Sequence, residues 1–102
     1  MKNAHARIRW LRPDEGGRAT PPPGPVYSTV AKFKQLAARW PQEAWSVVIR
    51  LNEPPDADGR MTVEIRMLVE GAPESFLEPG SVFELFEGRQ CVASGEVLHE
   101  QD

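Results

Sequence analysis

The residues that could do chemistry are few in this chain and lie far apart. Among its 102 residues are one cysteine, Cys91, and two histidines, His5 and His99, near opposite ends. Neither histidine has a Cys, His, Asp or Glu at metal-ligand spacing in an apolar setting. Cys91 lies in an alternating segment without a sequence partner nearby, which is typical of a buried thiol rather than a nucleophile. We therefore predict no metal site, no cofactor and no catalytic cysteine.

The acidic side chains form no recognisable catalytic or calcium motif. Asp56 and Asp58 share a loop with Gly59 but lack the remaining ligands of a calcium loop. The chain has no Gly-x-Ser-x-Gly, no phosphate-binding glycine-rich loop and no dinucleotide fingerprint. Most other carboxylates fall at outward strand positions or in turns, as on a solvated face. The sequence predicts that the protein is not an enzyme. The least favoured alternative is a small hydrolase whose site is built from distant residues.

The elements that must position these residues are mostly β-strands. Alternating or β-rich segments cover residues 6–11, 26–34, 45–51, 60–70, 82–86 and 90–98. Short connections and the lack of βαβ spacing indicate an antiparallel all-β domain, and closure removes the exposed edges of so small a sheet. We predict one domain over residues 1–102, a closed six-stranded antiparallel barrel, with residues 1–4 and 99–102 frayed.

Three local features refine this prediction. Phe33, Leu36, Ala37 and Trp40 follow helical spacing before a proline, so we expect at most one short helix near residues 34–40. In the fourth segment, Met61, Val63, Ile65, Met67 and Val69 are expected to face inward. In the sixth, Gly95 suggests a bulge or a close backbone approach.

Asp14, Glu15, Gly16, Gly17 and Arg18 join the first strand to the second. Two adjacent glycines permit positive φ, and a proline-rich stretch follows at residues 21–25, so a tight structural turn is the expected role. We expect its two acidic residues and its arginine to close one end of the barrel by charge-assisted hydrogen bonds. The alternative is a protein-docking face with Trp10 or Tyr27 as an aromatic anchor. For Trp10 we favour a place in the core.

Charge is unevenly distributed along the chain. Residues 1–50 carry nine Lys/Arg and three acids, a net +6, whereas residues 51–102 carry three and twelve, a net −9. We expect interleaved strands to pair these charges across neighbours. One cysteine excludes an internal disulfide, and the chain shows neither a secretory h-region nor an apolar run long enough to span a membrane. We predict a cytoplasmic location and no membrane partner.

Two stretches resemble the C-terminal β-barrel domain, the third domain, of elongation factor Tu. The first is Arg-Ile-Arg-Trp-Leu-Arg-Pro-Asp-Glu-Gly-Gly-Arg-Ala-Thr-Pro, residues 7–21. The second is Phe-Glu-Leu-Phe-Glu-Gly-Arg-Gln-Cys-Val-Ala-Ser-Gly-Glu-Val, residues 83–97. Their order and spacing match the family over about residues 6–98, although residues 35–60 match weakly. The resemblance implies a closed six-stranded barrel without GTP hydrolysis, because the GTPase domain is absent.

In that family the domain contacts the T stem of aminoacyl-tRNA and the nucleotide exchange factor. Glu87 and Gly88 match the Glu-Gly of its tRNA-contacting turn, but the preceding arginine is Phe86 here and the second glycine is Arg89. The family's histidine after Gly-Gly-Arg, its Tyr-Arg-Pro-Gln segment and a basic residue at the end of the fourth strand are also replaced; the residues found there are Ala19, Pro25 to Ser28 and Glu70. Most polar RNA contacts are therefore missing, and a net charge of −3 disfavours nucleic acid.

The resemblance implies a standalone, non-catalytic binding module. We expect the partner to be another protein, as for a decoy or an immunity-like protein, and keep a tRNA-binding accessory factor as the alternative. The candidate partner- or RNA-contacting residues are Arg18, Tyr27, Glu87, Gly88 and Arg89. A basic patch of Arg7, Arg9, Arg12 and Arg18 is the second candidate for RNA contact.

Overall fold

A computed structural model describes residues 3–99 and contains six strands and three short 3₁₀ helices. The strands are β1 (Asn3–Trp10), β2 (Val26–Phe33), β3 (Trp45–Arg50), β4 (Arg60–Met67), β5 (Val82–Glu87) and β6 (Gln90–Val97). The helices are η1 (Pro13–Glu15), η2 (Lys34–Arg39) and η3 (Glu74–Leu77). The expected fold class is confirmed, with all six strands within a few residues of their predicted bounds.

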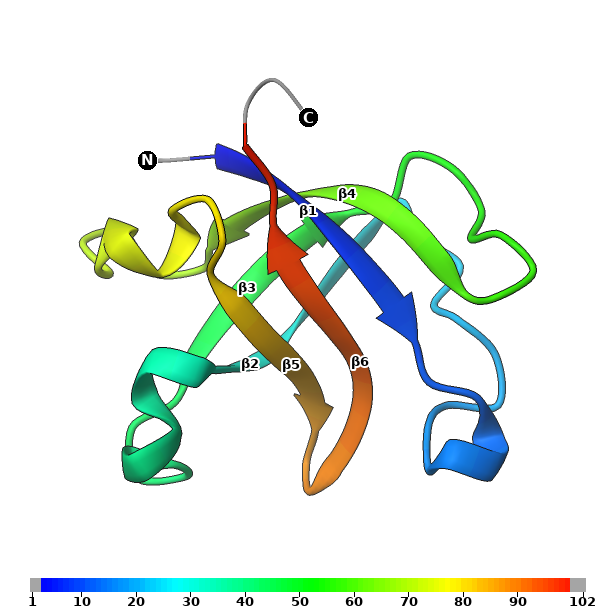
Figure 1. The fold of residues 1–102 in the computed structure, drawn as a ribbon, viewed down its shortest axis with the longest axis horizontal. Coiled ribbons are helices and arrows are strands. Elements are labelled where there is room, and N and C mark those ends of the chain that lie inside the picture. The colour runs from blue at the N-terminus through cyan, green and yellow to red at the C-terminus, as the bar shows by residue number, and fades with distance from the viewer. Residues whose placement is uncertain (1–2, 100–102) are drawn as a thin grey trace.

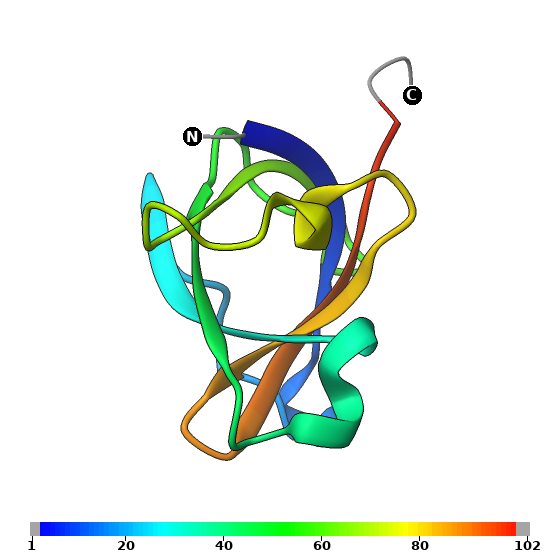
Figure 2. The same cartoon turned by 90° about the vertical axis from the view of Figure 1, so that its left-hand side faces the viewer.

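All strand pairs are antiparallel, and the sheet closes on itself in the order β1-β4-β3-β2-β5-β6. The closing contact is between the first and last strands, where Ala6 lies opposite Val97 and Trp10 opposite Ala93. In Figure 1 these two strands cross the front of the molecule, and Figure 2 shows the sheet wrapped around a central space. Closure leaves the ends of the barrel, rather than a sheet edge, as the natural place for loops to gather.

Two strand boundaries differ from the prediction. Residues 3 and 4, expected to be frayed, belong to β1 and lie opposite Arg66 and Ile65, because β4 is long enough to pair with them. At the other boundary, β4 ends at Met67, and Val69 is 54% exposed rather than inward-facing. The chain turns there into Gly71, whose φ is 89°. The other residues expected to fray are residues 1–2 and 100–102, which lie outside the described range, and His99, which follows the end of β6.

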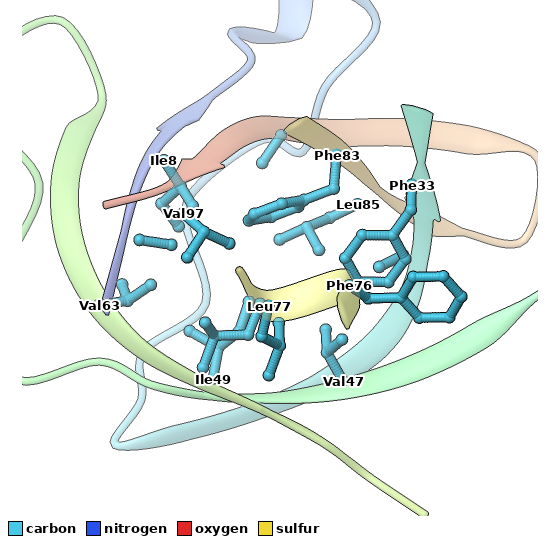
Figure 3. Packing of buried hydrophobic residues seen from close by; sticks show 14 of the residues in the cluster. Ile8, Phe33, Val47, Ile49, Val63, Phe76, Leu77, Phe83, Leu85 and Val97 are labelled. Atoms are coloured by element: carbon cyan, nitrogen blue, oxygen red, sulfur yellow. The ribbon is translucent and has the colours of Figure 1, made fainter. Parts of the chain in front are cut away.

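Inward-facing side chains fill the barrel (Figure 3). The alternation of β1 places Ala6, Ile8 and Trp10 in the core, and Trp10 is only 4% exposed, as expected. The short helix η3 adds Phe76, which stacks on Phe33 with ring centroids 4.8 Å apart. Burying aromatic and branched side chains of this size supplies the main favourable free energy for a domain this small.

The sixth strand contains the bulge that Gly95 suggested, but at another position, and side chains rather than another backbone approach the glycine. A Cβ on Gly95 would lie 2.6 Å from Cζ of Phe83 and 2.8 Å from Cγ2 of Ile8. The register shift lies between Leu85 and Phe86 of the partner strand, where Val92 is the extra residue. The bulge is therefore three residues before the glycine.

The bulge also explains why the prediction that Cys91 is a buried core thiol is wrong. Val92 and Ala93 are both buried, so the alternation of β6 changes phase at the bulge, and Cys91 is only partly buried. Its Sγ lies 3.6 Å from Oε2 of Glu84. Burial, followed by this carboxylate, raises the pKa of the thiol. The cysteine is thus a protonated outer-wall residue at neutral pH rather than a core thiol.

The predicted short helix is present as η2, with non-helical backbone angles at Leu36 in its middle. The single turns η1 and η3 are additional, and their length is below what periodicity can reveal. None of the helical segments in the described part of the chain is long and apolar enough to cross a membrane.

The strand order interleaves the two oppositely charged halves only in part. β1 lies between β4 and β6, whereas β2 and β3 are neighbours from the same half. Among residues 3–99, ion pairs between the halves join Arg18 with Glu87 and Arg50 with Glu64, the second at 3.9 Å. Arg39 with Glu43 and Arg60 with Asp58 form local pairs within one half.

Candidate functional site

The loop after β1 requires both of its glycines, for different reasons. Gly16 has φ of 88°, the left-handed region, with open space where a Cβ would be. A Cβ on Gly17 would lie 2.1 Å from the carbonyl oxygen of Leu11, which is an impossible contact. The amide of Gly17 donates to the carbonyl of Arg12 at 3.0 Å, so η1 folds the loop back against the end of β1. The expected structural turn is therefore present.

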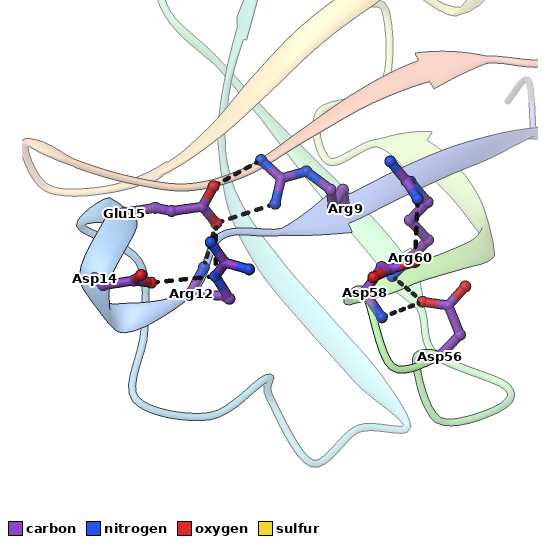
Figure 4. A network of polar contacts seen from close by, with 7 residues as sticks. All are labelled: Arg9, Arg12, Asp14, Glu15, Asp56, Asp58 and Arg60. Atoms are coloured by element: carbon purple, nitrogen blue, oxygen red, sulfur yellow. Dashed lines mark hydrogen bonds and ion pairs between the residues drawn. The ribbon is translucent and has the colours of Figure 1, made fainter.

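Glu15 holds this loop to the first strand (Figure 4). Both of its carboxylate oxygens accept from Arg9, at 3.0 and 3.2 Å, and one accepts from the backbone amide of Arg12 at 2.8 Å. These bonds, led by the one from Arg9, lower the pKa of Glu15 to about 2. Asp14 contacts only the exposed guanidinium of Arg12, at 3.2 Å. Of the two acids expected to close the barrel end, Glu15 joins the loop to β1, whereas Asp14 makes only a local, exposed contact.

Arg18 reaches across the barrel end to the hairpin between β5 and β6. Its Nη1 donates to Oε2 of Glu87 at 2.5 Å, and its Nε donates to the carbonyl of Thr20 at 3.0 Å. Tyr27 donates its hydroxyl to the same oxygen of Glu87, and its ring centroid lies 5.9 Å from Cζ of Arg18. Residues 18, 27 and 87, from three segments far apart in sequence, thus meet around one carboxylate.

The environment fixes the protonation states of this cluster. Burial, and then the hydrogen bond to Glu87, raises the pKa of Tyr27 to about 12. The hydrogen bond from Tyr27 is the main cause of the lowered pKa of Glu87, to which Arg18 adds while burial opposes it. Near neutral pH the tyrosine is therefore a donor and the glutamate a charged acceptor. A carboxylate bound in this way is a weak base, which suits recognition better than proton transfer.

The hairpin turn places Gly88 and Arg89 beside this cluster. Glu87 pairs with Gln90, and Gly88 has φ of 61°, so glycine takes the first central position as in a type II′ turn. Arg89 is exposed, and no carboxylate within residues 3–99 forms an ion pair with it. The five predicted contact residues, Arg18, Tyr27 and residues 87–89, are therefore together at one barrel end, which we name the hairpin end.

Sequence reasoning missed Gln90, which helps to assemble the hairpin end. Gln90 donates from Nε2 to the carbonyls of Gly16 and Gly17, both at 2.9 Å, and so fastens the loop to the hairpin. Trp10 packs edge-on against Tyr27 with ring centroids 5.6 Å apart. Periodicity could identify Trp10 as a core residue, but no local signal relates Gln90 to a loop more than seventy positions away.

The histidines lie closer together than their sequence positions suggest, because β1 pairs with β6. The backbone amide of Leu98 donates to the carbonyl of His5 at 2.8 Å, which brings the two histidine-bearing segments side by side. Within residues 3–99, however, no group of three or more His, Cys, Asp or Glu side chains is placed to hold a metal ion. The polar network of the hairpin end thus remains the best-supported candidate site.

Comparison with models of known protein families and with curated proteins found no match for this chain.

Proposed function

We propose that this protein is a non-catalytic binding module that docks another protein through its hairpin end. The observation that carries the proposal is the meeting of Arg18, Tyr27 and Glu87 from three distant segments beside the exposed hairpin residue Arg89. Interfaces favour aromatic and arginine anchors held in place before binding. The resemblance to the barrel domain of elongation factor Tu also supports a binding role, because both resembling motifs contribute to this end.

The network gives the docking face a rigid base. Glu87 already neutralises Arg18, and Gln90 holds the loop, so few side chains need ordering when a partner binds. Arg89 extends from this base without an acidic partner within residues 3–99. A partner that presents a carboxylate to Arg89 would form a charge-assisted, potentially bidentate contact.

RNA is the less favoured partner. Phosphate affinity comes from several unneutralised Lys and Arg, whereas at the hairpin end Glu87 neutralises Arg18 and Arg89 alone lacks an ion pair within residues 3–99. The chain as a whole carries −3. Both facts favour a protein partner over a tRNA.

The test compares two matched arginine variants. Arg89→Gln removes the exposed charge of the hairpin end, and Arg50→Gln makes the same change on the outer wall of β3, where the residue is also exposed. We expect a partner captured from cell extract by the wild-type chain to bind Arg89→Gln about tenfold more weakly or worse. Its affinity for Arg50→Gln should stay unchanged. Titration of the recovered partner against each variant measures both.

Two outcomes would contradict the proposal. Equal affinities of the recovered partner for both variants would show that the hairpin end is not the docking face. Loss of the captured material after ribonuclease treatment would identify the partner as RNA. Circular dichroism of both variants checks that neither substitution unfolds the barrel.

A further inference from the structure

A second polar surface lies on the outer wall of the barrel, on β1 and its two neighbours. In the register of the sheet, Arg9 lies directly opposite Arg60 of β4 on one side and Ser94 of β6 on the other. Arg7 is two residues earlier on the same face of β1, opposite Glu96. Same-face neighbours are about 7 Å apart along a strand, and adjacent strands are about 5 Å apart. The backbone positions of Arg7, Arg9 and Arg60 are thus close enough for their three guanidinium groups to contact one small ligand.

A hollow of about 330 Å³ lies among these side chains. It is lined by the three arginines, Ser94, Glu96 and Val82, together with Ile8 and Gly95. The lining side chains carry three positive charges and one negative charge. None of the hairpin-end residues lines the hollow, so this surface is separate from the proposed docking face.

Neighbouring carboxylates satisfy the arginines only in part. Arg9 donates hydrogen bonds from Nη1 and Nη2 to Glu15, and Arg60 donates one from Nη1 to Asp58 at 3.4 Å (Figure 4). Neither carboxylate lines the hollow. Arg7 forms no ion pair with a carboxylate of residues 3–99. Because each guanidinium has five N–H donors, donors remain on all three arginines.

Glu15 and Asp58 reduce the repulsion between Arg9 and Arg60, but both carboxylates lie outside the hollow. Like charges directly opposite on neighbouring strands destabilise a sheet, and here a third arginine shares the face. An anion between them would offset this repulsion, and planar guanidinium groups match the oxygens of phosphate. Val82, 41% exposed, adds an apolar wall for the organic part of such a ligand.

We propose that this hollow binds a small molecule that carries a phosphate or diphosphate group. The arginines and the Ser94 hydroxyl hold the oxyanion, and Val82 contacts the organic portion. The negative charge of Glu96 repels the oxyanion, so removal of this charge increases the affinity of the hollow for phosphate.

The experiment is a nuclear magnetic resonance titration of the full chain at low ionic strength. Inorganic phosphate, pyrophosphate and phenyl phosphate are the probes, and sodium chloride of matched ionic strength is the control salt. We expect saturable amide shifts confined to residues around Arg7, Arg9, Arg60 and Ser94, with no such shifts from chloride. Phenyl phosphate is expected to bind more tightly than inorganic phosphate, and Val82→Ser to remove that difference.

Variants distinguish specific phosphate binding in the hollow from a nonspecific effect of net charge. Arg7→Gln and Arg60→Gln should each weaken pyrophosphate binding about tenfold or more, since each removes charged hydrogen-bond donors. Glu96→Gln should strengthen it. Arg39→Gln is the matched control, because this arginine is also exposed and paired with one carboxylate. Its affinity for pyrophosphate should equal that of the wild-type chain.

Three results would overturn the proposal. The first is an absence of saturable shifts with every phosphate probe. The second is an equal loss of affinity in Arg39→Gln and Arg60→Gln, which would indicate a nonspecific charge effect. The third is binding of a short RNA when pyrophosphate causes no saturable shift, which would make the surface a polyelectrolyte contact.

Discussion

The most constrained side chain of the hairpin end is Tyr27. Trp10 packs against one part of its ring, the guanidinium of Arg18 lies near it, and its hydroxyl donates to Glu87. These contacts shield the phenol partly from water and place a negative charge beside it, and both effects favour the protonated form. The residue thus combines an apolar anchor with a fixed hydrogen-bond donor.

Because Tyr27 is the only tyrosine, its ionisation can be followed directly by the ultraviolet absorbance of tyrosinate. We expect a pKa of about 12 in the folded chain, against 10.0 for an ordinary tyrosine. The folded-state pKa is raised, so the stabilisation is complete below about pH 10 and is lost as pH rises through about 12.

The variant Glu87→Gln tests the second cause of this shift. Removing the carboxylate charge should lower the pKa of Tyr27 only part of the way towards 10, because burial is the larger cause. A wild-type pKa near 10 in chains still folded by circular dichroism would contradict the proposed environment.

At the scale of elements, the loop of η1 and the hairpin of β5 and β6 act as one unit. Gln90 bonds the carbonyls of both loop glycines, and Arg18 bonds Glu87, so each segment limits the movement of the other. The backbone of the loop can reach these positions only because Gly17 lies against Leu11. The conformation of one glycine therefore determines the shape of the hairpin end.

Alanine substitution at the two loop glycines separates backbone strain from steric overlap. Gly16→Ala should lower the free energy of unfolding by about 1–2 kcal/mol, since only the left-handed φ is unfavourable. Gly17→Ala should cost about 3 kcal/mol or more, because its Cβ would overlap the carbonyl of Leu11. Chemical denaturation measures both values. Equal costs, or a larger cost at Gly16, would show that overlap is not what requires glycine at position 17.

At the scale of the whole molecule, closure by β1 and β6 places Leu98 beside His5, whose backbone carbonyl accepts from the Leu98 amide at 2.8 Å. The pairing from Ala6 with Val97 to Trp10 with Ala93 completes the barrel between the first and last strands. In a closed antiparallel sheet, a break in one exposed loop need not remove any strand pairing.

This geometry predicts the behaviour of circular permutants. Joining residues 3 and 99 with a flexible linker and opening the chain between Glu53 and Pro54, both exposed, should preserve the fold and most of its stability. Opening it between Gly17 and Arg18 should be clearly more destabilising, because that cut separates the residues bonded to Gln90 from the residue bonded to Glu87. Thermal unfolding of both permutants measures the difference. Equal melting temperatures would show that the loop contributes little to the hairpin end.

Much of the fold could be predicted because its signals are local. Alternation with period two identified the inward face of β1 and most of that of β4, and turn residues marked the strand ends. The prediction was wrong where a neighbouring strand or the end of a strand decided the outcome. The bulge at Val92 moved Cys91 out of the core, and the turn after Met67 exposed Val69.

The sequence by itself determined the number of strands and their approximate bounds, since these depend on residue type and short-range spacing. The five residues proposed to contact a partner were suggested by the family resemblance. Only the tertiary structure decided that Glu15 binds Arg9, that Glu87 binds Arg18 and Tyr27, and that Arg9 lies opposite Arg60. Those contacts depend on strand order and register around the barrel. Both are set by the packing of the whole core and by no single segment of the chain.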